Sequence, residues 1–271
     1  MRLAVGIEYA GTRYAGWQRQ TDAASVQVTV EAALSEVAAA PVAVTCAGRT
    51  DAGVHALGQV AHFDTDAVRS RRSWLLGANT NLPPDVALTF VAPVADSFHA
   101  RYSALARRYR YLILNRGSRS PLFAERALWR HAPLDAERMH EALQVLCGEH
   151  DFSAFRAAEC QSQSPVRRLQ HISVRRAGEF IVLEVTANAF LHHMVRNIVG
   201  SALAVGEGAR PVAWLGELLA SRDRRQAGPT APAAGLCLVQ VDYPAADGVP
   251  PPAVDGLSAM IRAADAARGP G

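Results

Sequence analysis

The stretch that decides the fold is Cys46-Ala47-Gly48-Arg49-Thr50-Asp51-Ala52-Gly53-Val54-His55. It follows the β-branched run 42–45, which predicts a strand. Two glycines bracket Asp51, and glycine permits positive φ and close approach by a ligand. A carboxylate is therefore presented on a tight turn at a strand end, with Arg49 two residues before it. Such a turn is a candidate for catalysis if it faces a cleft, and an ordinary turn if it faces solvent.

Hydrophobic periodicity on both sides of this stretch predicts a β-α-β-β-α-β order, which resembles a ferredoxin-like unit. In the first half the expected strands are 2–9, 42–45, 59–64 and 86–94, with helices over 25–39 and 66–79. In the second half the expected strands are 107–114, 169–174, 180–187 and 236–241, with helices over 135–147, 192–205 and 211–221. We therefore predict an α+β or α/β fold in which two ferredoxin-like, RRM-like units are fused through one large mixed, mainly antiparallel sheet.

The domain organisation follows from this repeated order. Residues 1–103 are expected to form an N-terminal α/β half that carries the loop around Asp51, and residues 104–244 a C-terminal α/β half. Residues 245–271 are rich in Pro, Ala and Gly, which is typical of a flexible tail, with a short helix expected over 257–267.

All 28 basic residues of the chain are arginine. The lack of lysine excludes Schiff-base catalysis, a pyridoxal site and a Walker A loop, each of which needs that side chain. Phosphate contacts must then come from arginine, backbone N–H groups or hydroxyls. A net charge of +3 is too small to indicate a nucleic-acid partner on its own.

The four cysteines are scattered, without a C-x-x-C spacing, which favours reduced thiols over a disulfide framework or a zinc site. Neither a signal peptide nor a membrane-spanning apolar run is visible, so we expect a cytoplasmic protein. His192 and His193 are adjacent and are expected to point in different directions. His62 and Asp64 share a strand face without a visible third ligand. We therefore predict a site without metal or cofactor.

Arginines and aromatic residues gather in two places. The glycine-punctuated loop 10–20 suits either RNA contacts or a core around Trp17, and the strand 107–114 carries three arginines and two tyrosines. Arg196 lies in an otherwise apolar helix. A carboxylate with an ordinary pKa of about 3.9 must stay ionised in a pocket, and a buried arginine can achieve this. Arg196 is thus either a partner for Asp51 or a surface residue.

Several motifs together carry a family resemblance. They are Gly-Trp-Gln-Arg-Gln at 16–20, Gly-Arg-Thr-Asp-Ala-Gly-Val-His at 48–55, Phe-His-Ala-Arg at 98–101, Arg-Arg-Tyr-Arg-Tyr at 107–111, Asp-Phe-Ser-Ala-Phe-Arg at 151–156, and Asn-Ala-Phe-Leu-His-His-Met-Val-Arg-Asn-Ile-Val-Gly at 188–200. In this order they resemble the tRNA pseudouridine synthase A family, from about Leu3 to Tyr243. The resemblance implies the pseudouridine synthase fold.

The resemblance also implies an isomerase that converts uridines 38, 39 and 40 of the tRNA anticodon stem-loop into pseudouridine. Family members use no cofactor and are homodimers, so tRNA and a second copy of the chain are the expected partners. Asp51 is implied as the essential carboxylate, or nucleophile. Three routes remain open to it: attack on C1′, attack on C6, or help in deprotonating C2′ on a glycal route.

By motif position, Tyr109 is implied to stack on the target uracil, Arg196 to pair with Asp51, and Arg49 to take part in base flipping. Leu236 and Leu238 match a segment that walls the pocket, although a plain core strand fits them equally. Phosphate contacts are expected from a set of arginines: Arg13, Arg19, Arg101, Arg107, Arg108 and Arg110.

Two other functions are open to these residues. The first is a non-catalytic RNA-binding protein built from two ferredoxin-like units, which explains the arginine and tyrosine strand but not a paired Asp51. The second is a carboxylate-based glycoside or nucleoside hydrolase, which usually needs a second carboxylate across the scissile bond. Glu8 and Asp64 are the nearby strand candidates for that role.

Overall fold

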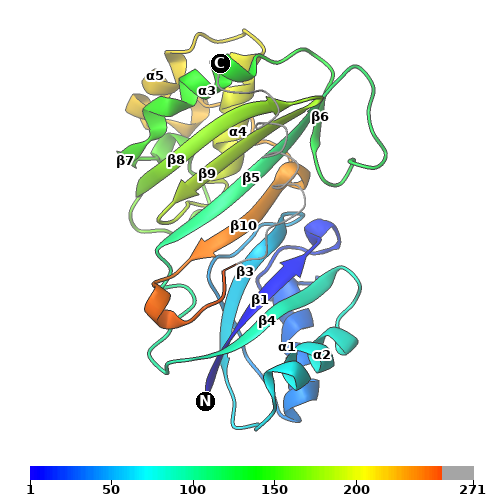
Figure 1. Ribbon diagram of the computed structural model, residues 1–271. Coiled ribbons are helices and arrows are strands. Elements are labelled where there is room, and N and C mark those ends of the chain that lie inside the picture. The colour runs from blue at the N-terminus through cyan, green and yellow to red at the C-terminus, as the bar shows by residue number, and fades with distance from the viewer. Residues whose placement is uncertain (252–271) are drawn as a thin grey trace. The chain divides into compact units, whose positions relative to one another are not determined.

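The computed structural model describes residues 1–251, which divide into two compact units (Figure 1). The first unit holds Met1–Arg107 and the described chain from Cys237, and the second holds Arg108–Leu236. The final strand therefore belongs with the first unit and not with the C-terminal half. The expected tail begins in an ordered form, because Val249 packs on the cluster of Ala4, Phe98 and Ala100. The helix expected over 257–267 lies outside the described residues.

The first unit has the predicted β-α-β-β-α-β order. Its elements are β1 (Arg2–Tyr9), α1 (Val26–Ala38), β2 (Thr45–Cys46), β3 (His55–Asp64), α2 (Arg71–Asn81) and β4 (Val86–Val94), joined by β10 (Leu236–Asp242). Strand β1 lies between β4 and β3 and is antiparallel to both, while β10 is parallel to β3 with Cys237 opposite His55. Helices α1 and α2 pack together, and α2 packs against β4 (Figure 1). A mixed α/β fold with mainly antiparallel strands is confirmed.

The second unit is built from the following elements: β5 (Ala106–Asn115, counted here from Arg108), β6 (Leu128–Arg130), α3 (Ala136–Leu143), β7 (Gly148–Asp151), β8 (Val166–Ala177), β9 (Phe180–Ala187), α4 (Met194–Gly206) and α5 (Trp214–Ser221). Strand β9 lies between β5 and β8, and the β8–β9 hairpin turns at Gly178, where φ is +60°. Helix α4 is buried along most of its length. In the described part of the chain, the helices are too short or too polar to cross a membrane.

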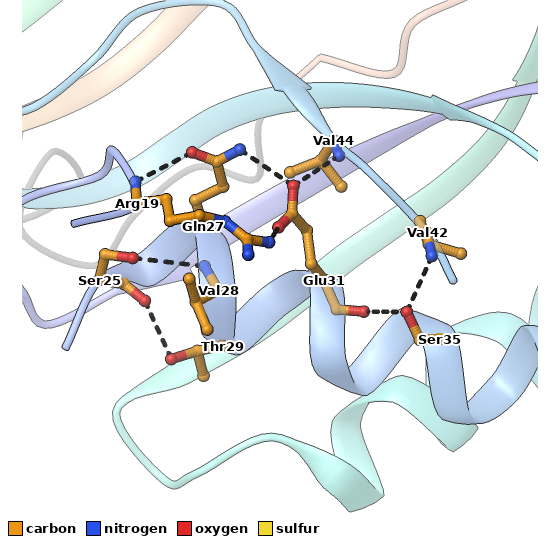
Figure 2. Close-up of polar contacts among 9 residues, drawn as sticks. All are labelled: Arg19, Ser25, Gln27, Val28, Thr29, Glu31, Ser35, Val42 and Val44. Atoms are coloured by element: carbon orange, nitrogen blue, oxygen red, sulfur yellow. Dashed lines mark hydrogen bonds and ion pairs between the residues drawn. The ribbon is translucent and has the colours of Figure 1, made fainter. Parts of the chain in front are cut away.

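The strand predicted over 42–45 is the clearest departure from expectation, because ladder pairing covers only Thr45–Cys46. The burial still alternates as in a strand, with Val42 and Val44 buried. Their backbone N–H groups donate to side chains of helix α1 instead: Val42 to Ser35 Oγ at 2.9 Å and Val44 to Glu31 Oε1 at 3.0 Å (Figure 2). The segment is therefore extended but satisfied by a helix.

Other boundaries moved for local reasons. Helix α2 begins at Arg71 because the hydroxyl of Ser70 accepts the N–H of Ser73 as an N-cap. Helix α4 begins at Met194 because His193 adopts a left-handed conformation with φ of 59°. The short strands β6 and β7 were not predicted, since three or four residues are too few to show a period.

Candidate active site

The loop from Ala47 to Val54 connects β2 to β3 and carries Asp51 half-buried at its turn. The N–H of Val54 donates to the Asp51 carbonyl oxygen at 3.1 Å, which closes the turn. Gly53, inside this turn, has φ of +77°, a conformation that favours glycine. The Asp51 carboxylate thus lies on a tight turn just before a strand, and we call residues 47–54 the catalytic loop because they carry the candidate catalytic residue.

A second segment, residues 14–17, forms backbone hydrogen bonds with the catalytic loop. The N–H of Trp17 donates to the Thr50 carbonyl at 3.0 Å, and the N–H of Gly53 donates to the Tyr14 carbonyl at 3.3 Å. Gly16 has φ of +98°, and a Cβ there would lie 2.6 Å from the Thr50 carbonyl oxygen. The backbone from Thr50 to Ala52 therefore packs directly against Gly16, where a larger residue would overlap with it.

Side chains and backbone of the first unit anchor the rest of the loop. Gln59 Nε2 donates to the Gly48 carbonyl at 2.6 Å, and the hydroxyls of Tyr9 and Thr50 are 2.7 Å apart. At the far end, the N–H of Gly11 donates to His55 Nδ1 at 3.1 Å. A loop held at so many points is preorganised, which is what positioning a reactive group requires.

The titratable groups next to the loop are tuned mainly by burial. Burial raises the pKa of the Cys46 thiol to about 12, against the opposing effect of the nearby Arg49 and Arg101 guanidiniums. Cys46 is therefore a neutral packing residue. Burial, followed by the charge of Arg2, lowers the pKa of His62 to about 4, so its ring is neutral near pH 7.

Two of the predicted phosphate-contacting arginines form ion pairs on the surface of the first unit. Arg13 pairs with Asp85 at 2.6 Å and Arg19 pairs with Glu31 at 2.5 Å, and both arginine side chains stay more than half exposed. Figure 2 shows how Glu31, on helix α1, faces Arg19 and the Val44 backbone together. Each of these guanidiniums is held by a carboxylate and is still exposed, so it remains suitable for binding an anionic ligand.

Glu31 is a buried carboxylate, 4% exposed, that also accepts from Gln27 Nε2 at 2.9 Å. Glu31→Ala should lower the free energy of unfolding by about 2–4 kcal/mol, because the Val44 N–H and the Gln27 amide lose a buried acceptor. Urea denaturation of the two proteins measures this change. Glu36→Ala, at an exposed position of the same helix, is the control and should change stability by less than about 0.5 kcal/mol. A loss for Glu31→Ala no larger than the control's would contradict this role.

Arg107 and Arg110, two of the arginines predicted to contact phosphate, are buried instead, at 8% and 4% exposed. Arg107 donates to the carbonyls of Ala47, Arg101 and Ala104. Arg110 pairs with Glu184 at 2.8 Å. Phosphate contact by these two guanidiniums is therefore not expected, since both hold the protein's own structure. Their arginine-rich strand resembled an RNA contact because sequence alone does not distinguish a buried arginine from an exposed one.

In the second unit, Tyr109 lies on β5 and is 8% exposed, with its ring edge-to-face against Phe190 at 5.1 Å. Its neighbour Arg108 is half-buried and donates through Nε to the Thr186 hydroxyl at 3.3 Å. Leu236 is buried at the start of β10, and Leu238, counted with the first unit, is buried two residues later. The two leucines have the burial of core strand residues.

Arg196 lies half-buried in the first turn of α4, and both its backbone and its side chain are fixed to residue 231. Its Nε donates to the Ala231 carbonyl at 2.7 Å, and the N–H of Ala231 donates to the Arg196 carbonyl at 3.1 Å. Asn197, fully buried, donates to the Phe155 carbonyl and accepts from Arg224 and Thr230. Asn197 was not identified from the sequence as a buried hydrogen-bonding residue, although an amide in an otherwise apolar helix indicates such a role.

The histidines considered as metal ligands behave differently from expectation. His62 Nδ1 accepts the N–H of Ala100 at 3.1 Å, and both oxygens of Asp64 are bound by Arg2, so this pair is engaged in other contacts. The rings of His192 and His193 were expected to diverge, yet their centroids are 4.0 Å apart. The prediction was wrong because the left-handed backbone at His193 turns the second ring back toward the first.

The predicted site residues thus fall into two groups. Asp51, Arg49, Arg13, Arg19, Arg101, Arg107 and Leu238 belong to the first unit, and Tyr109, Arg108, Arg110, Arg196 and Leu236 belong to the second. Within the first unit, Arg107 connects the catalytic loop to the segment that carries Arg101. Arg49 is exposed on the catalytic loop, two residues from Asp51. The pairing of Arg196 with Asp51 stays a prediction.

Comparisons with known proteins agree with one another. The family described as tRNA pseudouridine synthase matches residues 6–103 and 142–244. Over 250 residues the chain is 58% identical to tRNA pseudouridine synthase A of Aeromonas hydrophila subsp. hydrophila, covering 92% of this chain and 93% of that protein. Over 244 residues it is 61% identical to the protein of the same name from Methylococcus capsulatus, covering 90% of each.

Proposed function

The chain belongs to the tRNA pseudouridine synthase family, and from this we propose that it isomerises uridines 38, 39 and 40 of the tRNA anticodon stem-loop. In this reaction the N1–C1′ bond breaks, the uracil turns, C5 bonds to C1′, the proton on C5 leaves, and N1 takes up a proton. Product and substrate have the same composition, so the reaction needs no redox cofactor and no second substrate. The observation that carries the proposal is a single carboxylate, Asp51, on a loop anchored at both ends and at its centre.

Asp51 is the essential carboxylate of this proposal. Preorganisation supports that role, because Trp17 and Tyr14 hold the backbone around Asp51, and Tyr9 holds the Thr50 hydroxyl, before any substrate arrives. A flipped nucleotide can then meet a carboxylate that needs little rearrangement. Flipping itself costs a few kcal/mol, which contacts to the RNA backbone must supply.

The other roles follow the family motifs. Tyr109 stacks on the target uracil, Arg196 pairs with Asp51, Arg49 takes part in flipping, and Leu236 with Leu238 walls the pocket. The fixed Arg196 backbone and side chain support its use as a positioned charge. Phosphate contacts come from the arginines that are exposed or half-buried: Arg13, Arg19, Arg101 and Arg108. We further propose a cytoplasmic homodimer in which one subunit docks the tRNA that reacts at its partner.

The hydrolase alternative is disfavoured by the positions of the two carboxylates considered for it. Asp64 is the last residue of β3 and His55, which follows the catalytic loop, is the first, so about 30 Å of strand separates Asp64 from His55, and both Asp64 carboxylate oxygens are bound by Arg2. Glu8 points to the opposite face of β1 from Tyr9, whose hydroxyl contacts the catalytic loop. Neither is placed to act across a bond from Asp51.

The products of the reaction test the proposal. After incubation with an unmodified tRNA transcript, the RNA is digested to nucleosides and analysed by liquid chromatography and mass spectrometry. We expect pseudouridine to replace uridine mole for mole, with no uracil released. Released uracil would indicate a hydrolase, and bound but unchanged RNA would indicate a binding protein.

A further inference from the structure

Residues 98–103 of the first unit form a hydrogen-bonded turn, of which the proposed function uses only Arg101. The His99 N–H donates to Ser103 Oγ at 3.0 Å, and the Ser103 N–H donates to the His99 carbonyl at 2.8 Å. His99 Nδ1 accepts the N–H groups of Arg101 and Tyr102, both at 3.2 Å. Phe98, the first residue of the turn, is buried and anchors the turn in the core.

Three aromatic rings lie in contact one after another at this turn, the first pair tilted by 58°. The buried His62 ring lies 4.8 Å from the His99 ring, and the His99 ring lies 4.3 Å from the Tyr102 ring at 30°. Tyr102 is 77% exposed, the most of any Phe, Tyr or Trp side chain in residues 1–251, where the next, Trp129, is 41% exposed. Tyr102 is therefore a surface ring whose orientation is set from within.

One exposed guanidinium lies beside this ring. The Arg101 guanidinium lies 5.8 Å from the Tyr102 ring centre and its residue is exposed. The Arg107 guanidinium donates to the carbonyls of both Arg101 and Ala47, so the turn is tied to the start of the catalytic loop. An exposed aromatic ring beside an arginine, fixed to the same frame as Asp51, has the features of a nucleobase stacking platform.

We propose that the outer face of Tyr102 stacks on an unpaired base of the RNA substrate, with Arg101 contacting its phosphate. This base is a second one, distinct from the target uracil, and its capture registers the RNA relative to the catalytic loop. A protein partner fits less well, since a single ring flanked by charge offers little apolar area. The proposal rests on the proposed function for the identity of the RNA.

The test measures binding of an anticodon-arm RNA whose positions 38, 39 and 40 are cytidine, so that no reaction intervenes. Tyr102→Ala should raise the dissociation constant about 5- to 150-fold, the range expected for loss of one base–aromatic stack. Tyr102→Phe keeps the ring and should stay near the wild-type value. Leu105→Ala removes an apolar side chain that is 56% exposed and close in sequence, and should also have little effect.

Two further readouts separate stacking from a general loss. With 2-aminopurine placed in the loop of the same RNA, fluorescence should be quenched at one position by the wild type and by Tyr102→Phe, but not by Tyr102→Ala. With reactive tRNA, Tyr102→Ala should raise KM and leave kcat nearly unchanged.

Unchanged binding by Tyr102→Ala would overturn the proposal. So would an equal loss in Tyr102→Phe or Leu105→Ala. A wild-type protein that shows the Tyr102-dependent binding but forms no pseudouridine would support the platform and refute the proposed function. Pseudouridine formation with unchanged Tyr102→Ala binding would do the reverse.

Discussion

Replacing Asp51 with asparagine is expected to slow pseudouridine formation by at least about 10⁴-fold, the scale seen when a reactive group is removed from an active site. The amide has nearly the same shape but is neither a nucleophile nor a base. The turn should persist, because the hydrogen bond that closes it uses the Asp51 backbone carbonyl, which the variant keeps. Tritium release from 5-³H-uridine tRNA under single-turnover conditions measures the rate.

The control for this variant is Asp22→Asn, which removes the same charge at an exposed position of the same unit. It should react at close to the wild-type rate. Binding of tRNA, measured by filter retention, should be nearly the same for the wild type and both variants. Full activity of Asp51→Asn would refute its assignment, and lost tRNA binding would show that the residue acts before the chemistry.

Gly16→Ala should have the second largest effect, through the backbone that supports the catalytic loop. The new Cβ would lie 2.6 Å from the Thr50 carbonyl and 3.1 Å from the Asp51 carbonyl carbon, at a residue with φ of +98°. The Thr50–Asp51 backbone must therefore move, and misplacing a reactive group by about 1 Å can cost on the order of 10²-fold in rate. We expect such a loss in kcat, together with about 2–5 kcal/mol of stability from strain and overlap.

Gly178→Ala is the matched control, because Gly178 has φ of +60° and open space around its Cβ position. It carries the conformational strain of alanine at positive φ, about 1–2 kcal/mol, without a clash near the catalytic loop. Urea denaturation and single-turnover rates of both variants give the comparison. Equal activity of Gly16→Ala and Gly178→Ala would show that the contact between residue 16 and the loop does not set the geometry of Asp51.

Elements with a strong local pattern were predictable from sequence. Strand β1 and helix α1 are examples, since alternation in one and the Ser25 cap with an apolar face in the other coincide with the structure. Segment 42–45 could not be resolved this way. Its alternation is that of a strand, but its backbone N–H groups donate to the side chains of Ser35 and Glu31 instead of to a neighbouring strand. The choice between these acceptors depends on which of them lies closer in the folded protein, and the sequence does not give that distance.

The candidate site likewise has features that were predictable from the sequence and features that were not. The tight turn at Asp51 was predictable because Gly53, two residues later, takes a positive φ there, whereas the role of Asp51 stays a prediction. The burial of Arg107 and Arg110 was not, because the acceptors that make it possible are remote in sequence, such as Glu184 for Arg110 and Ala47 for Arg107. The exposed position of the Tyr102 ring was not predictable either, since it depends on where the His99 and His62 rings lie in the folded protein.

The measurement that tests the central claim most directly is positional mapping of pseudouridine in tRNA. Transcripts with uridine at position 38, 39 or 40, and cytidine at the other two, are treated in parallel with the wild type and with Asp51→Asn. The residues that become pseudouridine are then located by carbodiimide-dependent stops in primer extension. We predict a stop at the single anticodon-arm uridine of each transcript with the wild type, and none with Asp51→Asn. Stops only outside the anticodon arm, or equal stops with both proteins, would contradict the account.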